Sequence, residues 1–353
     1  MRFTSDWVLT LLIGTTLAAG CGDRITTPIG ADSLQRQATI RDLVGLGGYW
    51  AMAEGVNDFG RVVGAASDNR GRSRAFSWSE LGGIRDLGTL GGEFAAATAI
   101  NSTSQIVGWA TTTDGSHAFL ATAGQSMQDL GTPSGGIASW ANAIGDDGTI
   151  VGGWRRADGA SRAFIWTASK GMRDLVAGPF AGDAEATGVN SVGQVVGFGA
   201  DAETGEAHAL LWTPNGDVQD LGALPGGAEG VAWSISNNGI VVGASTTRGG
   251  TQHAFRWTPE AGMTDLGVLP GMDWSVANDV SDKGEIVGSS GRNGSPLGRA
   301  FIWSGRDGMR DLGALIASES AATGALSVNW SGNVVGFSWN GSSYRPVIFP
   351  AVR

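Results

Sequence analysis

Short runs of apolar and β-branched residues alternate along the chain with turns rich in Gly, Ser, Thr, Asn and Asp. One set of four runs occupies residues 97–101, 105–108, 117–120 and 127–130. Short runs bounded by turn residues are typical of β-strands, and no stretch has the helical period of about 3.6 residues. The pattern predicts an all-β chain, and we name the four successive strands of each set A, B, C and D.

The set recurs along the chain with a nearly constant period. Strand D ends in Asp-Leu in every copy, and its Asp residues are Asp42, Asp86, Asp129, Asp174, Asp220, Asp265 and Asp311. Successive Asp residues are 44, 43, 45, 46, 45 and 46 positions apart. A fixed period of about 40–50 residues is typical of propellers and solenoids. We predict a seven-bladed β-propeller of four-stranded blades over residues 39–353, with an open β array as the alternative.

Strands A and B carry small residues at fixed places. They are joined by turns of the form Asn-x-x-Gly, as at residues 57–60 and 190–193. Every strand A contains an Ala (Ala53, Ala97, Ala141, Ala186, Ala232, Ala277 and Ala325), and every strand B ends in a Gly (Gly64, Gly108, Gly152, Gly197, Gly243, Gly288 and Gly336). The hairpin register sets each Ala opposite a Gly, which predicts that neighbouring sheets converge there, near the axis of the propeller.

Strands C and D carry opposite charges at a fixed separation. A His or Arg in strand C precedes the Asp of strand D by 12 residues, and a hairpin would make the two cross-strand neighbours. The predicted pairs are Arg74–Asp86, His117–Asp129, Arg162–Asp174, His208–Asp220, His253–Asp265 and Arg299–Asp311. Arg345 has no strand D after it, and Asp42 has no strand C before it. Both find a partner if the N-terminal strand joins the last blade and closes the ring.

The beginning of strand C also carries a family resemblance. The motif stands as His117-Ala118-Phe119 and His253-Ala254-Phe255, with Arg-Ala-Phe at 74, 162 and 299 and weaker forms at 208 and 345. In this motif the chain resembles the HAF-repeat family of secreted bacterial proteins over residues 39–353. The resemblance implies an exported repeat protein, and it brings no agreed activity and no catalytic residues.

The N-terminal residues lie outside the repeats. Residues 1–20 have a charged start and a short apolar middle, which predicts a signal peptide. The join at residues 17–21 resembles a lipobox, although its Leu stands one place early, and Cys21 is then the lipidated residue. Residues 21–38 are expected to form a flexible tether, and simple secretion or an uncleaved anchor is the alternative. We expect an exported protein, either an outer-membrane lipoprotein or a surface or extracellular one, that meets a membrane through its lipid alone.

Charge and motif content narrow the chemistry. The net charge is −10 and no basic stripe occurs, so nucleic acid is not an expected partner. The sequence contains no calcium-loop, phosphate-loop, zinc or Gly-x-Ser-x-Gly motif, so no metal, cofactor or catalytic residue is predicted. All three His residues occupy a position that is Arg in other repeats, which favours a structural role, since Arg neither accepts a hydrogen bond nor gives up its proton.

Loop variation points to a binding face. The B–C and D–A connections vary in length, and both emerge at one end of a four-stranded blade. That end carries the candidate ligand-binding aromatics Trp50, Phe94, Trp140, Trp233 and Trp274. Such side chains suit stacking on sugars or docking of an apolar partner, although Trp140 and Trp233 also have the parity of buried positions.

The sequence favours a non-enzymatic binding or scaffold propeller for an unknown polysaccharide, peptide or protein. One alternative is a polysaccharide hydrolase or lyase that uses carboxylates of the same loops. These are Glu54, Glu93, Asp183, Glu185, Glu229, Asp273, Asp279 and Glu319. A purely structural surface protein is the other alternative.

Overall fold

The computed structural model describes residues 41–349 except 44, 123–124, 181, 296–297 and 316–321. Within them the chain forms 28 strands and a single short 3₁₀ helix, η1 (Gly313–Leu315), so the all-β prediction is confirmed. The predicted signal peptide, Cys21 and most of the tether lie outside the described residues. Among the described residues, no helix has the length and apolar character needed to span a membrane.

The strands form successive antiparallel sheets, each with strands A to D in chain order. The first three sets are β2 (Gly47–Val56), β3 (Val62–Asp68), β4 (Ser73–Ser79) and β5 (Gly83–Asp86); β6 (Ala95–Ile100), β7 (Ile106–Thr111), β8 (Ser116–Ala121) and β9 (Gln128–Gly131); and β10 (Gly136–Ile144), β11 (Ile150–Arg156), β12 (Ser161–Thr167) and β13 (Gly171–Asp174). The next three are β14 (Ala184–Val189), β15 (Val195–Ala200), β16 (Ala207–Trp212) and β17 (Val218–Asp220); β18 (Gly230–Ile235), β19 (Val241–Thr246), β20 (Gln252–Thr258) and β21 (Gly262–Asp265); and β22 (Trp274–Val280), β23 (Ile286–Gly291), β24 (Gly298–Ser304) and β25 (Gly308–Asp311). The last sheet contains β26 (Ala322–Val328), β27 (Val334–Trp339), β28 (Tyr344–Phe349) and β1 (Arg41–Asp42).

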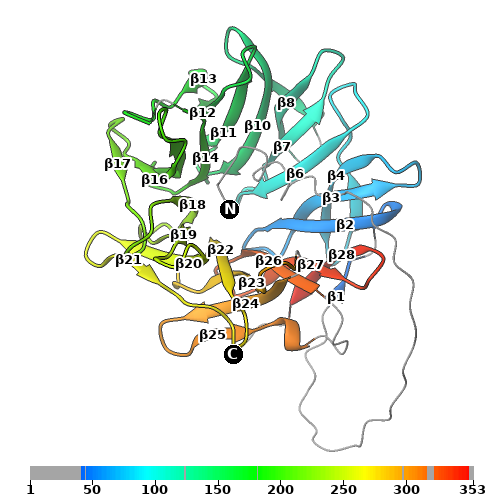
Figure 1. The fold of residues 1–353 in the computed structure, drawn as a ribbon. Coiled ribbons are helices and arrows are strands. Elements are labelled where there is room, and N and C mark those ends of the chain that lie inside the picture. Colours follow the sequence, from blue (N-terminus) through cyan, green and yellow to red (C-terminus); the bar gives the residue numbers. More distant parts are fainter. Residues whose placement is uncertain are drawn as a thin grey trace, which may run out of the picture.

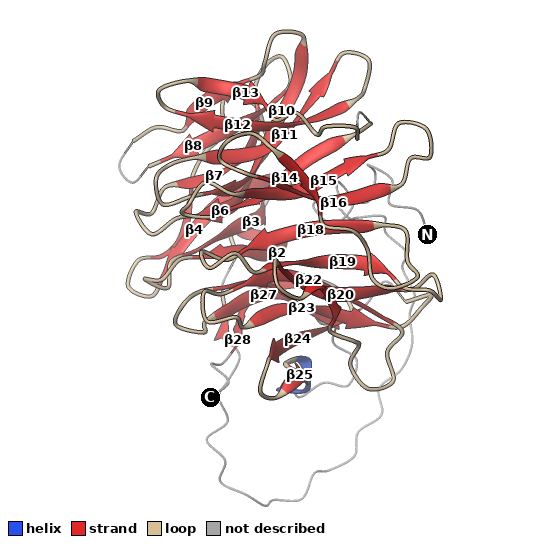
Figure 2. Cartoon of the chain, turned by 90° about the vertical axis from the view of Figure 1, so that its left-hand side faces the viewer, coloured by secondary structure: helices blue, strands red, loops and turns tan. Residues whose placement is uncertain are grey.

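The sheets succeed one another around a common centre, which gives a propeller-like fold (Figure 1). Figure 2 shows the same sheets from the side, with the axes of their strands running in similar directions. Each strand A contacts the strand A of the next sheet, and β26 contacts β2. One parallel pairing, Ala138 with Ser116, joins the second and third sheets into a single hydrogen-bonded sheet.

The two ends of the described chain meet in the last sheet. Strand β1 pairs antiparallel with β28, with Asp42 opposite Val347. The backbone N–H of Leu43 donates to the Pro346 carbonyl at 3.0 Å, and the Leu43 side chain is buried. The first and last strands therefore belong to one sheet.

Small residues face each other where strands A and B pair, as predicted. Ala97 stands opposite Gly108, and the other six sheets repeat this register. A Cβ atom on Gly108 would lie 2.0 Å from the carbonyl oxygen of Ala96. No side chain fits at that distance without movement of the backbone, and this explains the Gly at this position of strand B. Gly108 is the third of the six residues of β7, so the prediction that strand B ends at the Gly was wrong.

A β-bulge follows the Ala in every strand A, which the sequence did not predict. The bulged residues are Glu54, Thr98, Asn142, Thr187, Trp233, Asn278 and Leu326. Four of their side chains donate to the backbone carbonyl of the recurring strand-A Ala in the next sheet. These bonds join Thr98 to Ala141 at 2.8 Å, Asn142 to Ala186 at 2.9 Å, Thr187 to Ala232 at 2.8 Å and Asn278 to Ala325 at 2.8 Å. The bulge thus turns a side chain outward to tie neighbouring sheets together.

The core lies between adjacent sheets. The Phe of strand C is fully buried in five copies: Phe76, Phe119, Phe164, Phe255 and Phe301. Phe119, for example, packs against Val63 and Ala75 of the preceding sheet. Truncation of such a Phe to Ala typically costs about 3–5 kcal/mol of stability. The rigid inter-sheet core fixes the turns that meet at the centre.

Candidate functional site

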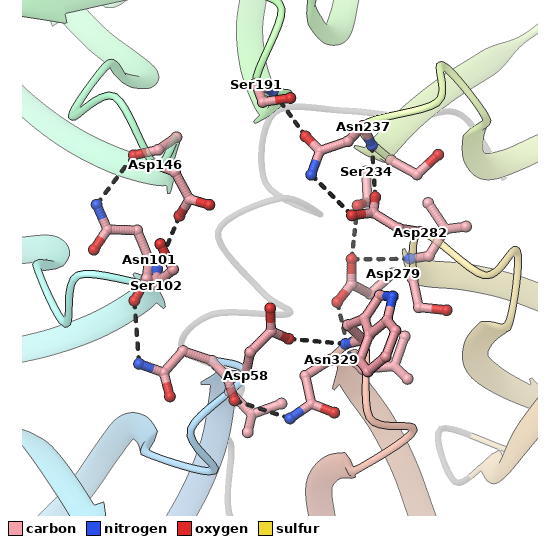
Figure 3. A pocket seen from close by; sticks show the side chains of 18 of the residues that line it. Asp58, Asn101, Ser102, Asp146, Ser191, Ser234, Asn237, Asp279, Asp282 and Asn329 are labelled. Atoms are coloured by element: carbon pink, nitrogen blue, oxygen red, sulfur yellow. Dashed lines mark hydrogen bonds between the residues drawn. The ribbon is translucent and has the colours of Figure 1, made fainter.

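A cavity of about 230 Å³ lies where the A–B turns of the seven sheets meet (Figure 3). We call it the axial cavity. Its wall is mainly polar and includes Asp58, Asn101, Ser102, Asp146, Ser191, Asn237, Asp279, Asp282, Asn329 and Trp330. No Lys, Arg or His is among the described residues that line it.

In four of the A–B turns the first residue is an Asn that shapes the turn and ties it to the next one. The Asn57 side-chain oxygen accepts from the N–H groups of Phe59 and Arg61, and Gly60 closes the turn with a φ of 72°. The Asn57 Nδ2 group donates to the Asn101 carbonyl at 3.1 Å. Equivalent bonds join Asn101 to Gly145, Asn190 to Ser236 and Asn329 to Asn57.

The second residues of four turns make a similar link. The backbone N–H of each donates to the side chain of the second residue in the next turn: Ser102 to Asp146, Ser191 to Asn237, Asn237 to Asp282 and Trp330 to Asp58, at 2.7–3.0 Å. In Asp58 and Asp146 the Oδ1 atom takes this bond, and no donor in the described part of the chain bonds to Oδ2. Figure 3 shows both carboxyl groups facing the interior of the ring.

Asp279 lies deeper and joins three sheets. It accepts from the hydroxyls of Ser234 and Ser327 at 2.7 and 2.9 Å, and from the N–H groups of Val328 and Val280 at 2.9 Å each. Burial raises the pKa of Asp279, and these four hydrogen bonds act in the opposite direction. Since its oxygens are occupied by the protein itself, Asp279 holds the wall of the axial cavity.

Two exposed aromatic side chains stand on neighbouring turns at the mouth of the axial cavity. Trp330, which lines the cavity, is 55% exposed, and Phe59 is 80% exposed. The Lys283 Nζ atom lies 4.0 Å from the centre of the Trp330 ring. An exposed indole beside carboxylate, amide and hydroxyl groups offers an apolar surface next to hydrogen-bonding groups.

Most of the predicted ligand-binding aromatics lie away from the A–B turns. Trp50, Phe94 and Trp274 are near the beginnings of their strands A, Trp140 is in the middle of β10, and Trp233 is the bulged residue of β18; none of the five lines the axial cavity. Trp140 donates to Glu185 at 2.6 Å, and Trp274 donates to the Arg292 carbonyl at 3.2 Å. The sequence placed binding at the end of the variable loops, whereas the axial cavity lies at the end of the short A–B turns.

Two carboxylates of strand A have perturbed acidity. Burial raises the pKa of Glu54 to about 7. Glu185 is almost fully buried; burial raises its pKa above the usual value, although hydrogen bonds from Trp140 and Asn142 act in the opposite direction. Carboxyl groups of this kind are candidates for acid–base chemistry. Glu319 of the predicted set lies outside the described residues.

The predicted His/Arg–Asp pairs lie diagonally rather than directly across the strands, because the residue opposite each Asp is the Phe or Leu of strand C. The distances are 3.0 Å for Arg74–Asp86, 2.9 Å for His117–Asp129, 3.0 Å for His208–Asp220, 2.9 Å for His253–Asp265 and 2.7 Å for Arg299–Asp311. Arg162 instead donates to the carbonyls of Ser161 and Gly182. The backbone register places Asp42 as in the other sheets, and its pairing with Arg345 stays a prediction.

No metal site is apparent in the described part of the chain. No group of three or more His, Cys, Asp or Glu residues there has the geometry to hold an ion. The carboxylates of the axial cavity are spread around the ring and bonded to neighbouring turns.

Comparison with known proteins shows no relative by sequence. No family model matches the chain, and no curated protein matches it. The assignment to the HAF-repeat family was therefore wrong: nothing in the comparisons indicates a HAF repeat, and the similar structures are propeller proteins of other kinds.

Solved structures show the fold. A puromycin hydrolase is similar with a TM-score of 0.55 and 16% identity, over 92% of this chain and 56% of that one. An oligogalacturonate lyase in complex with manganese is similar with a TM-score of 0.59 and 9% identity, over 89% of this chain and 96% of that one. A puromycin-hydrolyzing peptidase of Mycobacterium tuberculosis is similar with a TM-score of 0.57 and 12% identity, over 86% of this chain and 49% of that one. The chain spans about half the length of the two puromycin-hydrolysing proteins, and at these identities the likeness is one of fold alone.

Proposed function

We propose that the chain is a closed seven-bladed propeller that binds a neutral sugar of an oligosaccharide or polysaccharide in the axial cavity, without turnover. The pairing of β1 with β28 and the bond from Asn329 to Asn57 support closure. A closed ring brings all seven A–B turns to one mouth. This is the geometry from which the binding proposal follows.

The observation that carries the proposal is the chemistry of the axial cavity wall. Asp58 and Asp146 offer free carboxylate oxygens to hydroxyl donors, and Trp330 offers an apolar ring face beside them. Anionic ligands are disfavoured because the described lining contains several carboxylates and no cation, and the nearby Lys283 ammonium group already lies over one face of the Trp330 ring. Its volume of about 230 Å³ is below the roughly 300–1,000 Å³ of sites for drug-sized ligands, so we infer that one sugar residue enters.

The test is calorimetric titration of the whole chain with cellotetraose, maltotetraose, xylotetraose and chitotetraose. Trigalacturonate and tetralysine serve as anionic and cationic probes. We expect saturable binding of at least one neutral sugar and none of trigalacturonate. Tetralysine binding alone would replace the sugar by a cationic ligand and overturn the proposal.

A pair of Trp variants locates the binding site. Trp330→Ala should weaken sugar binding about tenfold, because a stacked aromatic ring contributes about 0.5–1.5 kcal/mol and about 1.4 kcal/mol corresponds to tenfold. Trp274→Ala, at the end favoured by the loop pattern, is the matched control and should bind normally. Loss of binding in Trp274→Ala with retention in Trp330→Ala would place the site at the other end.

A polysaccharide hydrolase or lyase is the second candidate, and the comparisons fit it better than they fit a protein without activity, since the similar proteins are enzymes. The elevated pKa of Glu54 is the observation in this chain that favours it. Release of reducing ends or unsaturated products from the same sugars would support this candidate. The activity should then vanish in Glu54→Gln and persist in Glu260→Gln, whose carboxyl is exposed.

Export and lipidation complete the proposal. We infer attachment through Cys21, on the lipobox-like residues 17–21. Metabolic labelling with palmitate should mark the chain and fail to mark Cys21→Ser. Labelling that persists in the variant would contradict lipidation at this residue.

A further inference from the structure

The third sheet, β10–β13, departs from the repeat at its charged pair. In five other sheets the His or Arg of strand C pairs with the Asp of strand D. Here the Arg162 Nη1 atom donates to the carbonyls of Ser161 and Gly182, at 2.9 Å each. Within the described residues, no ion pair joins Arg162 or Asp174 to any partner. The two opposite charges are therefore present but separated.

The same sheet departs from the repeat at a second position. Two residues after the Gly of strand B, the other six copies carry Ala, Gly or Ser, whereas the third carries Trp154. Trp154 is 5% exposed, and its Nε1 donor has no hydrogen-bond partner in the described part of the chain. Buried donors are nearly always satisfied, so the unpaired Nε1 marks Trp154 as an unusual packing position of this sheet.

A cavity of about 440 Å³ brings these departures together. We call it the Trp154 pocket; Trp154, Arg162 and Asp174 line it, with Ser134 and the pair Arg156–Asp158. The Arg156 and Asp158 side chains lie 3.1 Å apart and largely neutralise each other. What remains for a ligand is one guanidinium and one carboxylate.

We propose that the Trp154 pocket binds a small zwitterion with a free amino group and a free carboxylate, of the size of an amino acid or dipeptide. The carboxylate of the ligand bonds to the unused N–H groups of Arg162, and its ammonium group pairs with Asp174. An anion would leave Asp174 without a partner, and a cation would leave Arg162 without one. The volume lies within the range of roughly 300–1,000 Å³ known for small-molecule sites. This site does not depend on sugar binding at the axial cavity.

Blocked ligands test the proposal without any variant. The whole chain is titrated by calorimetry with the dipeptide Ala-Ala, with its N-acetyl form and with its C-terminal amide. We expect saturable binding of Ala-Ala, and at least tenfold weaker binding of each blocked form. No binding of Ala-Ala, or equal binding of all three, would overturn the proposal.

Two matched variants test the location. Asp174→Asn should weaken Ala-Ala binding at least tenfold, whereas Asp86→Asn, whose carboxylate is paired with Arg74, should leave it unchanged. Equal effects of Asp174→Asn and Asp86→Asn would show that the Trp154 pocket is not the site.

Discussion

Replacement of Glu54 by Gln tests the role of the bulge in strand A. At the equivalent bulged positions, Thr98 and Asn142 donate hydrogen bonds to the Ala carbonyl of the next sheet. A carboxylate at position 54 cannot donate such a bond, whereas a protonated carboxyl or an amide can. By the repeat register, the acceptor for residue 54 is the Ala97 carbonyl. Glu54→Gln should therefore act as a permanently protonated Glu54.

The magnitude follows from the acidity of Glu54. Burial raises its pKa from 4.5 to about 7, so the folded state binds the proton more tightly than the unfolded state. The resulting stability is fully present below pH 4.5 and is lost as the pH rises through about 7. At about 1.4 kcal/mol per pH unit, the gap between 4.5 and about 7 corresponds to about 3.5 kcal/mol, and partial exposure of the side chain reduces it to roughly 2 kcal/mol.

The assay is urea denaturation of wild type and Glu54→Gln at pH 5, 6, 7, 8 and 9. We expect a small difference in the free energy of unfolding at pH 5, which grows until the variant is more stable by roughly 2 kcal/mol at pH 8. Glu260→Gln, at an exposed position, should show no such trend. A difference that does not change with pH, or a variant less stable at pH 8, would refute the reasoning.

Three further predictions concern the scaffold. Gly108→Ala should lower the free energy of unfolding in urea by about 3 kcal/mol, because the added Cβ atom would meet the backbone of Ala96. Gly249→Ala, whose Cβ atom would have no atom closer than 3.8 Å, should be nearly neutral, and equal values for the two variants would contradict the packing argument. His253→Arg should change that free energy by less than about 0.5 kcal/mol, since Arg74 already makes the same exposed pair with Asp86; a larger loss would reopen a special role for His253. Leu43→Ala should cost about 2–5 kcal/mol in the same assay, because Leu43 is buried beside Phe76 and Val335; an unchanged midpoint would contradict ring closure by the first strand.

The sequence predicted those features that the same type of residue marks at the same position of every repeat. The strands and the pairing of Ala97 with Gly108 followed from small and apolar residues at fixed spacing. The bulge could not be predicted, because its seven positions hold Glu, Thr, Asn, Trp and Leu and share no side-chain property. The turn of Arg162 away from Asp174 was equally hidden, since its acceptor, the Gly182 carbonyl, belongs to the next sheet.

The sequence prediction and the proposed function place the binding end differently for a physical reason. Variation in loop length drew attention to Trp50 and Trp274, whose sheets are far apart in the chain. The A–B turns looked like plain connections, although the motif Asn-x-x-Gly recurs in them. Their polar side chains become a wall only when seven turns converge, which is a property of the tertiary structure.

Fluorine NMR of the whole chain labelled with 5-fluorotryptophan tests the central claim most directly. Each of the 14 Trp residues gives one signal, and single Trp→Phe variants assign them. On titration with the neutral tetrasaccharide that binds best, the account predicts a shift of the Trp330 signal, with those of Trp50, Trp140, Trp233 and Trp274 unmoved. Shifts confined to these four, or no shift at all, would contradict sugar binding at the axial cavity.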